Sequence, residues 1–147
     1  MKKLYVVNLC VLLIMFLTAG IVGRPNTDSS QIKLLVTDRI TALNDYYSQD
    51  TTYDETEDIL RKLEKEKLLR SDLALMKAYS ATDMDRIQTS KVKVKSCKRT
   101  SYGIIKGNAE ISYVMYGQHG KWRDKQVYFF TAEDKKGKIK LTQLKKI

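Results

Sequence analysis

The second half of the chain alternates hydrophobic and polar residues with a period of two, the spacing of an extended strand. The clearest stretch is 91–95, in which lysines alternate with valines. Gly107 inside a later run predicts a bulge or a bend, and Gly137 ends a predicted hairpin loop at its left-handed position. The pattern predicts four strands joined by tight turns, over residues 91–99, 104–116, 122–133 and 138–144.

The first half repeats hydrophobic residues with a helical period. Between residues 32 and 47 they recur at three- and four-residue spacing, so Ser29 or Ser30 is expected to cap a helix that ends near Tyr47. Together with the strands, this pattern predicts an α+β domain. Three helices are expected to pack on one face of a bent, four-stranded antiparallel meander.

The second helix is expected to begin at Thr52, because Thr52 and Glu55 have the spacing of a capping box. Acidic residues fill its first turns and basic residues lie toward its end near Arg70, which suits the helix dipole. Ser71 is expected to cap the third helix. Residues 82–89 are expected to form a loop that leads into the sheet.

The chain begins with a basic start, Lys2 and Lys3, followed by an uncharged hydrophobic run, residues 4–23. As a helix this run would span roughly 30 Å, enough to cross a bilayer, and it also fits a secretory signal. Residues 1–23 are therefore predicted to be a signal peptide or a membrane anchor. Either function places the rest of the chain outside the cell, with a linker at 24–30 and one domain at 31–147.

Charge is divided unevenly along the domain. Residues 24–89 hold ten basic and thirteen acidic residues, whereas residues 90–147 hold fifteen basic and four acidic ones. Lysine on exposed strands can simply prevent edge-to-edge pairing, or it can form a docking surface for an anionic partner. The lysines that would form such a surface are Lys91, Lys93, Lys95, Lys138 and Lys140.

Aromatic residues gather in the predicted strands. They are either core residues or the lining of a ligand-binding pocket. The candidates are Tyr113, Tyr116, Trp122, Tyr128 and Phe130. Basic strands with interleaved aromatics also suit single-stranded nucleic acid, but an exported domain makes that partner unlikely.

Residues for catalysis or metal binding are scarce. His119 is the only histidine and is expected in a turn, while Asp124 and Glu110 are expected to pair with neighbouring lysines. Cys97 is the only cysteine outside the hydrophobic run, so the domain is expected to lack an internal disulfide. No catalytic group, metal site or cofactor is therefore predicted.

The order of elements resembles the cystatin-like, nuclear transport factor 2-like superfamily over residues 30–145. Tyr46-Tyr47 at the end of the first helix and the Lys-Val-Lys-Val run of the first strand support the resemblance. In detail the chain resembles small extracytoplasmic members from Gram-positive bacteria, and it is similar to the periplasmic domain of the type IV secretion inner-membrane assembly factor. The resemblance implies a bent sheet wrapped around its helices. It also implies that the sheet forms a cone, which is the active site of those members that are isomerases or dehydratases.

We expect a non-enzymatic, extracytoplasmic binding or assembly module with a basic sheet face. Its expected partner is an envelope protein or an anionic surface polymer or lipid, and a homo-oligomer is possible. One alternative is a small-molecule-binding or isomerase-like pocket in the cone of the sheet. Another is a subunit of a conjugation or secretion machine.

Overall fold

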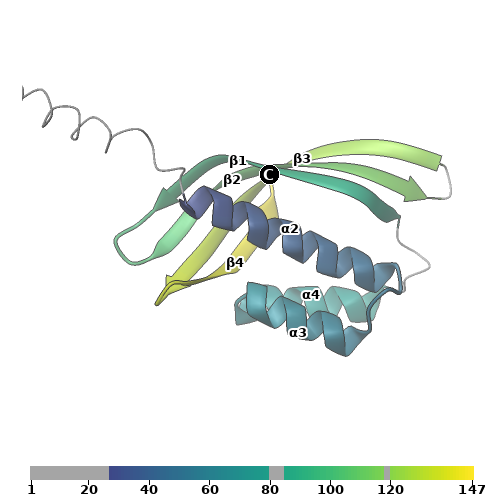
Figure 1. Cartoon of the computed structure of the whole chain (residues 1–147), viewed down its shortest axis with the longest axis horizontal. Helices are drawn as coiled ribbons and strands as arrows, with labels where there is room; N and C mark the ends of the chain where they lie inside the picture. Colours follow the sequence, from purple (N-terminus) through teal and green to yellow (C-terminus); the bar gives the residue numbers. More distant parts are fainter. Residues whose placement is uncertain (1–26, 80–84, 118–119) are drawn as a thin grey trace, which may run out of the picture.

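The computed structural model describes residues 27–79, 85–117 and 120–147. In this part of the chain three helices precede a four-stranded sheet, as Figure 1 shows, so the predicted α+β class is confirmed. The helices are α2 (Thr27–Tyr47), α3 (Tyr53–Leu63) and α4 (Glu66–Ala78). The strands are β1 (Arg86–Arg99), β2 (Ile104–Gly117), β3 (Gly120–Lys135) and β4 (Lys138–Lys146).

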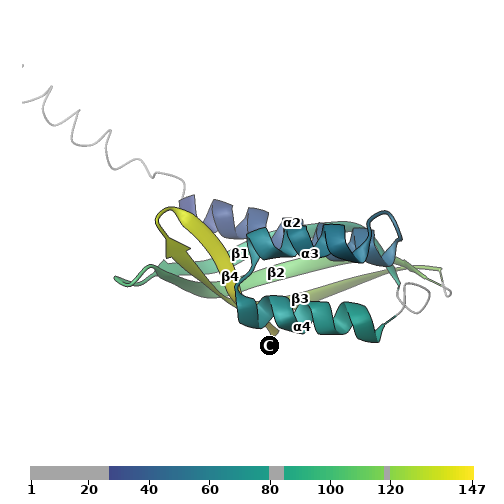
Figure 2. The same ribbon diagram turned by 90° about the horizontal axis from the view of Figure 1, so that it is seen from below.

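The sheet is an antiparallel meander in the order β1-β2-β3-β4. The helices pack on one face, with α2 against β1 and α4 against β4. Figure 2, which views the molecule from the helical side, shows α3 and α4 in front of the sheet. The described residues contain no helix long and apolar enough to cross a membrane. The predicted signal or anchor, residues 1–23, lies outside them.

The core lies between α2 and the inner face of the sheet, which is the face that the helices cover. Strand alternation places apolar residues of all four strands on this inner face, where they form one buried cluster with residues of α2. These strand residues are Val92, Ile111, Phe130 and Leu141, and they pack with Ile32, Val36 and Ile40. A second buried cluster, Ala42, Leu60, Leu69 and Met76, joins the three helices.

The predicted capping box at the start of α3 is confirmed. The Glu55 N–H donates to Thr52 Oγ1 at 3.3 Å, and the Thr52 N–H donates to Glu55 Oε2 at 2.8 Å. The β3–β4 hairpin is also confirmed, with Lys136 and Gly137 both at positive φ (55° and 79°), as a tight two-residue turn requires.

The second helix ends earlier than the sequence predicts. Glu64 is extended at the end of α3, and the Lys65 N–H donates to the Leu141 carbonyl at 2.7 Å. This bond along the edge of β4 breaks the expected single helix into α3 and α4. Ser71 therefore lies inside α4 and does not cap it.

Two other predictions need correction in the sheet. Arg86–Thr89 form the start of β1 instead of a loop, because the long β2 offers partners up to Tyr116. The extra residues at the two register shifts between β1 and β2 are Gln88 and Lys95 of β1, not Gly107 of β2. Gly107 instead permits a close approach, since a Cβ there would lie 1.9 Å from the Ser96 carbonyl oxygen.

Candidate functional site

The outer face of the sheet, opposite the helices, is covered by none of the elements that the structure describes (Figures 1 and 2). Strand alternation places Val92 inside and its neighbours Lys91 and Lys93 outside. The register pairs Lys91 with Ser112, and Ser112 with Lys125 on β3. We define the outer basic surface by its exposed cations: Lys91, Lys93, Lys95, Arg123 and Lys125.

Glu110 lies in the middle of the outer basic surface. Its carboxylate pairs with Lys125 at 3.1 Å and with Lys95 at 3.2 Å. These hydrogen bonds, led by that of Lys125, lower the pKa of Glu110, so that this carboxyl group is ionised at neutral pH. Among the described residues no carboxylate pairs with Lys91, Lys93 or Arg123, and these cations are available to an external anion.

Apolar side chains separate the cations of this surface. Val114, Val127 and Phe129 belong to the outer face and are each partly exposed. A shallow groove of about 550 Å³ runs past Lys91, Val114 and Lys125. Apolar side chains beside cations are common at binding surfaces, because the apolar groups contribute binding energy and the cations select an anionic partner.

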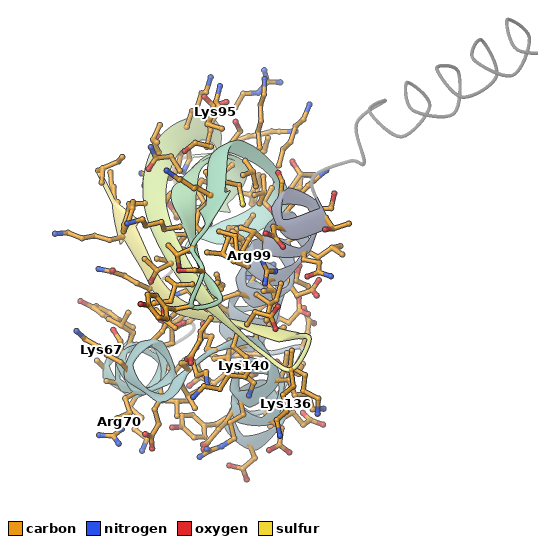
Figure 3. All side chains as sticks on the ribbon, turned by 90° about the vertical axis from the view of Figure 1, so that its left-hand side faces the viewer. Lys67, Arg70, Lys95, Arg99, Lys136 and Lys140 are labelled. Atoms are coloured by element: carbon orange, nitrogen blue, oxygen red, sulfur yellow. The ribbon has the colours of Figure 1, made fainter. Side chains whose placement is uncertain are left out.

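Lys138 and Lys140 do not belong to the outer basic surface. They lie on β4, and β1 forms the opposite edge of the sheet. Lys140 Nζ donates to the Arg61 carbonyl at the end of α3 at 2.5 Å, while Lys138 is exposed beside the β3–β4 turn. In Figure 3, Lys95 lies at the top and Lys140 in the lower half. The five predicted lysines therefore form two separate groups.

The five predicted aromatics do not line one pocket. Tyr113 and Tyr128 share a cleft between α2 and the inner face of the sheet, whereas Phe130 is completely buried in the core. Tyr116 is 63% exposed on the outer face, because strand alternation turns it away from Tyr113. Trp122 is 40% exposed, and its Nε1 donates to Asp85.

The cleft that contains Tyr113 and Tyr128 has a volume of about 290 Å³ and is also lined by Arg39, Leu43 and Tyr47. We call it the inner cleft. The Tyr128 hydroxyl donates to Gln126 at 2.8 Å. Burial, followed by the hydrogen bond with Tyr128, raises the pKa of Tyr113, so the Tyr113 ring presents a neutral hydroxyl group.

A buried ionic cluster that the sequence analysis missed lies behind the inner cleft. Arg39 Nε is 2.7 Å from Glu64 Oε1, and Arg39 Nη2 is 2.7 Å from Asp72 Oδ1. Both acidic residues are only 2% exposed. A sequence signal existed, because Asp72 continues the apolar stripe of Leu69 and Met76 at helical spacing.

One guanidinium cannot balance two buried carboxylates. Burial, reinforced by the adjacent Asp72, raises the pKa of Glu64 to about 8. Glu64 Oε2 is buried and accepts no hydrogen bond. At neutral pH the cluster therefore holds a protonated Glu64 beside an Arg39–Asp72 ion pair.

Within the described ranges no group of three or more His, Cys, Asp or Glu side chains is placed to hold a metal ion. Cys97 is a free, half-buried thiol. Asp124 accepts a hydrogen bond from Gln126, and not from a neighbouring lysine side chain as predicted. His119 lies outside the described residues.

Comparison with known proteins identifies the fold. No protein-family model matches the chain, and no curated protein matches its sequence. The structure is similar to that of the intermembrane space region of the chloroplast protein ARC6, with 14% identity and a TM-score of 0.52 over 84% of this chain and 98% of that one. A chain named as a variant of Rd1NTF2_05 has 15% identity and a TM-score of 0.45, over 74% of this chain and 92% of that one. At 14% identity, the likeness to the ARC6 region shows the fold alone.

Proposed function

We propose that this protein is a non-enzymatic binding module whose outer basic surface docks an anionic partner, either an envelope protein or a surface polymer. The supporting observation is a sheet face that holds Val114, Val127 and Phe129 together with Lys91, Lys93 and Arg123, cations that pair with no carboxylate among the described residues. Two copies of such a face would repel each other, which favours a partner of opposite charge over a homo-oligomer through this surface.

We also propose an extracytoplasmic setting, with residues 4–23 as a single-pass anchor or a cleaved signal. The finer resemblance to small Gram-positive extracytoplasmic proteins and to the type IV secretion assembly factor suggests an assembly role. The alternative role as a subunit of a conjugation or secretion machine belongs to the same setting. Mass spectrometry of the native N-terminus tests the extracytoplasmic setting. An intact N-terminus indicates an anchor, and a start near residue 21 or 24 indicates secretion. Recovery of the full chain from the cytosol would refute both.

The docking proposal can be tested by salt elution of the full chain, in nonionic detergent, from immobilised polyphosphate. Lys91→Glu/Lys93→Glu is expected to elute at clearly lower salt than the wild type and to lose roughly tenfold or more in affinity. Both side chains are exposed, so the free energy of unfolding should change by less than about 0.5 kcal/mol.

The matched control is Lys62→Glu/Lys67→Glu, which changes the net charge equally on exposed positions of α3 and α4. This control is expected to elute close to the wild type. If both double variants shift equally, retention reports only net charge and the proposal is wrong.

A second candidate function is small-molecule binding in the inner cleft, which includes the isomerase-like alternative. It is supported by the open volume beside Tyr113 and Tyr128 and by the nearby buried acid Asp72. Leu43→Trp should fill the cleft and abolish any thermal stabilisation of the wild type by small hydroxyaromatic compounds such as p-nitrophenol. Equal stabilisation of both proteins would place the compound elsewhere.

A further inference from the structure

Three segments that are far apart in sequence meet at one end of the domain. They are the first turn of α2, the β1–β2 turn and the β3–β4 turn (Figures 1 and 3). Arg99 connects them, since its Nη2 is 2.6 Å from Asp28 of α2 and its Nη1 is 2.6 Å from Asp134 of β3. The Asp134 N–H also donates to the Gly103 carbonyl at 2.9 Å.

We call this region the hairpin end and define it as residues 98–106 and 135–138. Among the described residues Tyr102 is the most exposed large hydrophobic side chain, at 87%, and Ile104 nearby is 43% exposed. Five exposed lysines surround these two residues: Lys98, Lys106, Lys135, Lys136 and Lys138.

Nearby acidic groups neutralise only part of this charge. Asp28 and Asp134 both bind Arg99, and each side chain is only 16% exposed. Glu133 pairs with Lys135 at 3.1 Å and with Lys65 at 3.3 Å. The hairpin end is therefore a positively charged surface with an exposed aromatic ring at its tip.

The opposite end of the domain carries acidic residues. It contains the end of α2 and the start of α3, as Figure 1 shows. Its acidic residues are Asp45, Asp50, Asp54, Glu55 and Asp58. These acidic residues offset the exposed cations Arg86, Lys121 and Arg123 of the same end, so an anionic surface would attract the hairpin end more strongly.

The hydrophobic run also leads to the hairpin end. It ends at Gly23, and α2 begins at Thr27, in contact with the hairpins through Asp28. Four residue steps span at most about 14 Å. A run held in a bilayer therefore keeps the hairpin end close to the membrane surface, within about two Debye lengths at physiological salt.

We propose that the hairpin end lies on the membrane and binds anionic phospholipid headgroups. Lys98, Lys106, Lys136 and Lys138 would contact phosphate groups, and the Tyr102 ring would sit at headgroup depth, the usual position of aromatic side chains at membrane interfaces. A soluble polyanion would account for the lysines but not for the exposed Tyr102 and Ile104. This proposal requires residues 4–23 to be retained as an anchor. It is independent of the outer basic surface.

The chain offers a built-in control, because its single tryptophan, Trp122, pairs with Met115 near the β2–β3 end of the sheet. The full chain would be placed in phosphatidylglycerol-containing bilayers whose acyl chains are brominated near the headgroup. Fluorescence quenching of wild-type Trp122 would be compared with that of Tyr102→Trp/Trp122→Phe. The indole at position 102 is expected to be quenched severalfold more strongly.

Charge reversal tests the lipid chemistry. Adding Lys136→Glu/Lys138→Glu to the Tyr102→Trp/Trp122→Phe variant should weaken its contact with the lipid headgroups by about fivefold for each lysine, and so lower the quenching. Replacing phosphatidylglycerol with phosphatidylcholine should lower the quenching as well. Lys91→Glu/Lys93→Glu should leave the quenching unchanged, so this proposal and the docking proposal can fail separately. Tyr102→Trp alone, which keeps Trp122, covers the case in which the double variant folds poorly.

Three results would overturn the proposal. They are equal quenching at positions 102 and 122, quenching at position 102 that is insensitive to lipid charge, and a native chain that starts near residue 21 or 24 without its anchor.

Discussion

Phe129 and Phe130 are adjacent in β3, and they belong to opposite faces of the sheet. Phe130 is opposite Gly107, is 0% exposed and packs in the core with α2. Phe129 is opposite Asn108 and is partly exposed on the outer face, with Lys145 as its partner on β4. One alternating pattern thus supplies both a face that holds the fold together and a face open to a partner.

The comparison shows where this domain can vary without unfolding. The inner face excludes water, so changes of volume or charge there affect the packing of α2. The outer face keeps its cations hydrated, and their spacing is set by the backbone of β1, β2 and β3. Consecutive residues of a strand therefore have different roles: the inner-face residue stabilises the fold, and the outer-face residue is available to a partner.

The largest expected difference between the faces is between these two phenylalanines. Phe130→Ala should lower the free energy of unfolding by about 3–5 kcal/mol, through lost burial and a cavity. Phe129→Ala should cost about 1 kcal/mol or less, because its ring is already partly in water. Urea denaturation of both variants measures the difference.

If Phe130→Ala does not fold, Phe130→Leu can replace it. This variant is expected to lower the free energy of unfolding by roughly 1–2 kcal/mol. If Phe129→Ala and Phe130→Ala lower the free energy of unfolding equally, the two faces are packed alike and the contrast between them is wrong.

A smaller effect is expected from the ionic cluster behind the inner cleft. The pKa of Glu64 is raised from 4.5 to about 8 by burial and by Asp72, so the folded state holds a proton that the unfolded state releases. The free energy of unfolding should therefore fall as pH rises from about 4.5 to about 8, by at least about 1 kcal/mol. Glu64→Gln, which mimics the protonated form, should remove most of this fall.

Urea titrations between pH 5 and pH 8.5 would measure this dependence. Glu66→Gln is the matched control, because Glu66 is exposed at the start of α4 and should leave the wild-type slope intact. A wild-type protein whose stability does not fall over this range would mean that Glu64 is ionised inside the fold.

Much of the fold can be predicted from local pattern. The Lys-Val alternation of β1 correctly predicts which side chains share a face, because pleating is a property of a single strand. The capping box of Thr52 and the turn glycine Gly137 also depend only on neighbours in sequence. Such signals locate the elements and their apolar faces.

Other features depend on contacts between distant segments. The break between α3 and α4 arises because the Lys65 N–H bonds to Leu141 of β4, 76 positions later in the chain. The Arg39 guanidinium contacts Asp72 of α4 and Glu64 between α3 and α4, and no local rule predicts that these three side chains meet.

The residues of the candidate sites also divide into those placed by local pattern and those placed by contacts between distant segments. The sequence by itself determined that Lys91 and Lys93 share a face, because residue parity in a strand decides it. The same parity separates Tyr113 from Tyr116, which the prediction of one pocket containing both overlooked. Only the tertiary structure decided that Lys138 belongs to the hairpin end and not with Lys91, because strand order places β1 and β4 at opposite edges of the sheet. Which charges act together is set by how the strands and helices pack, and that packing depends on the whole chain.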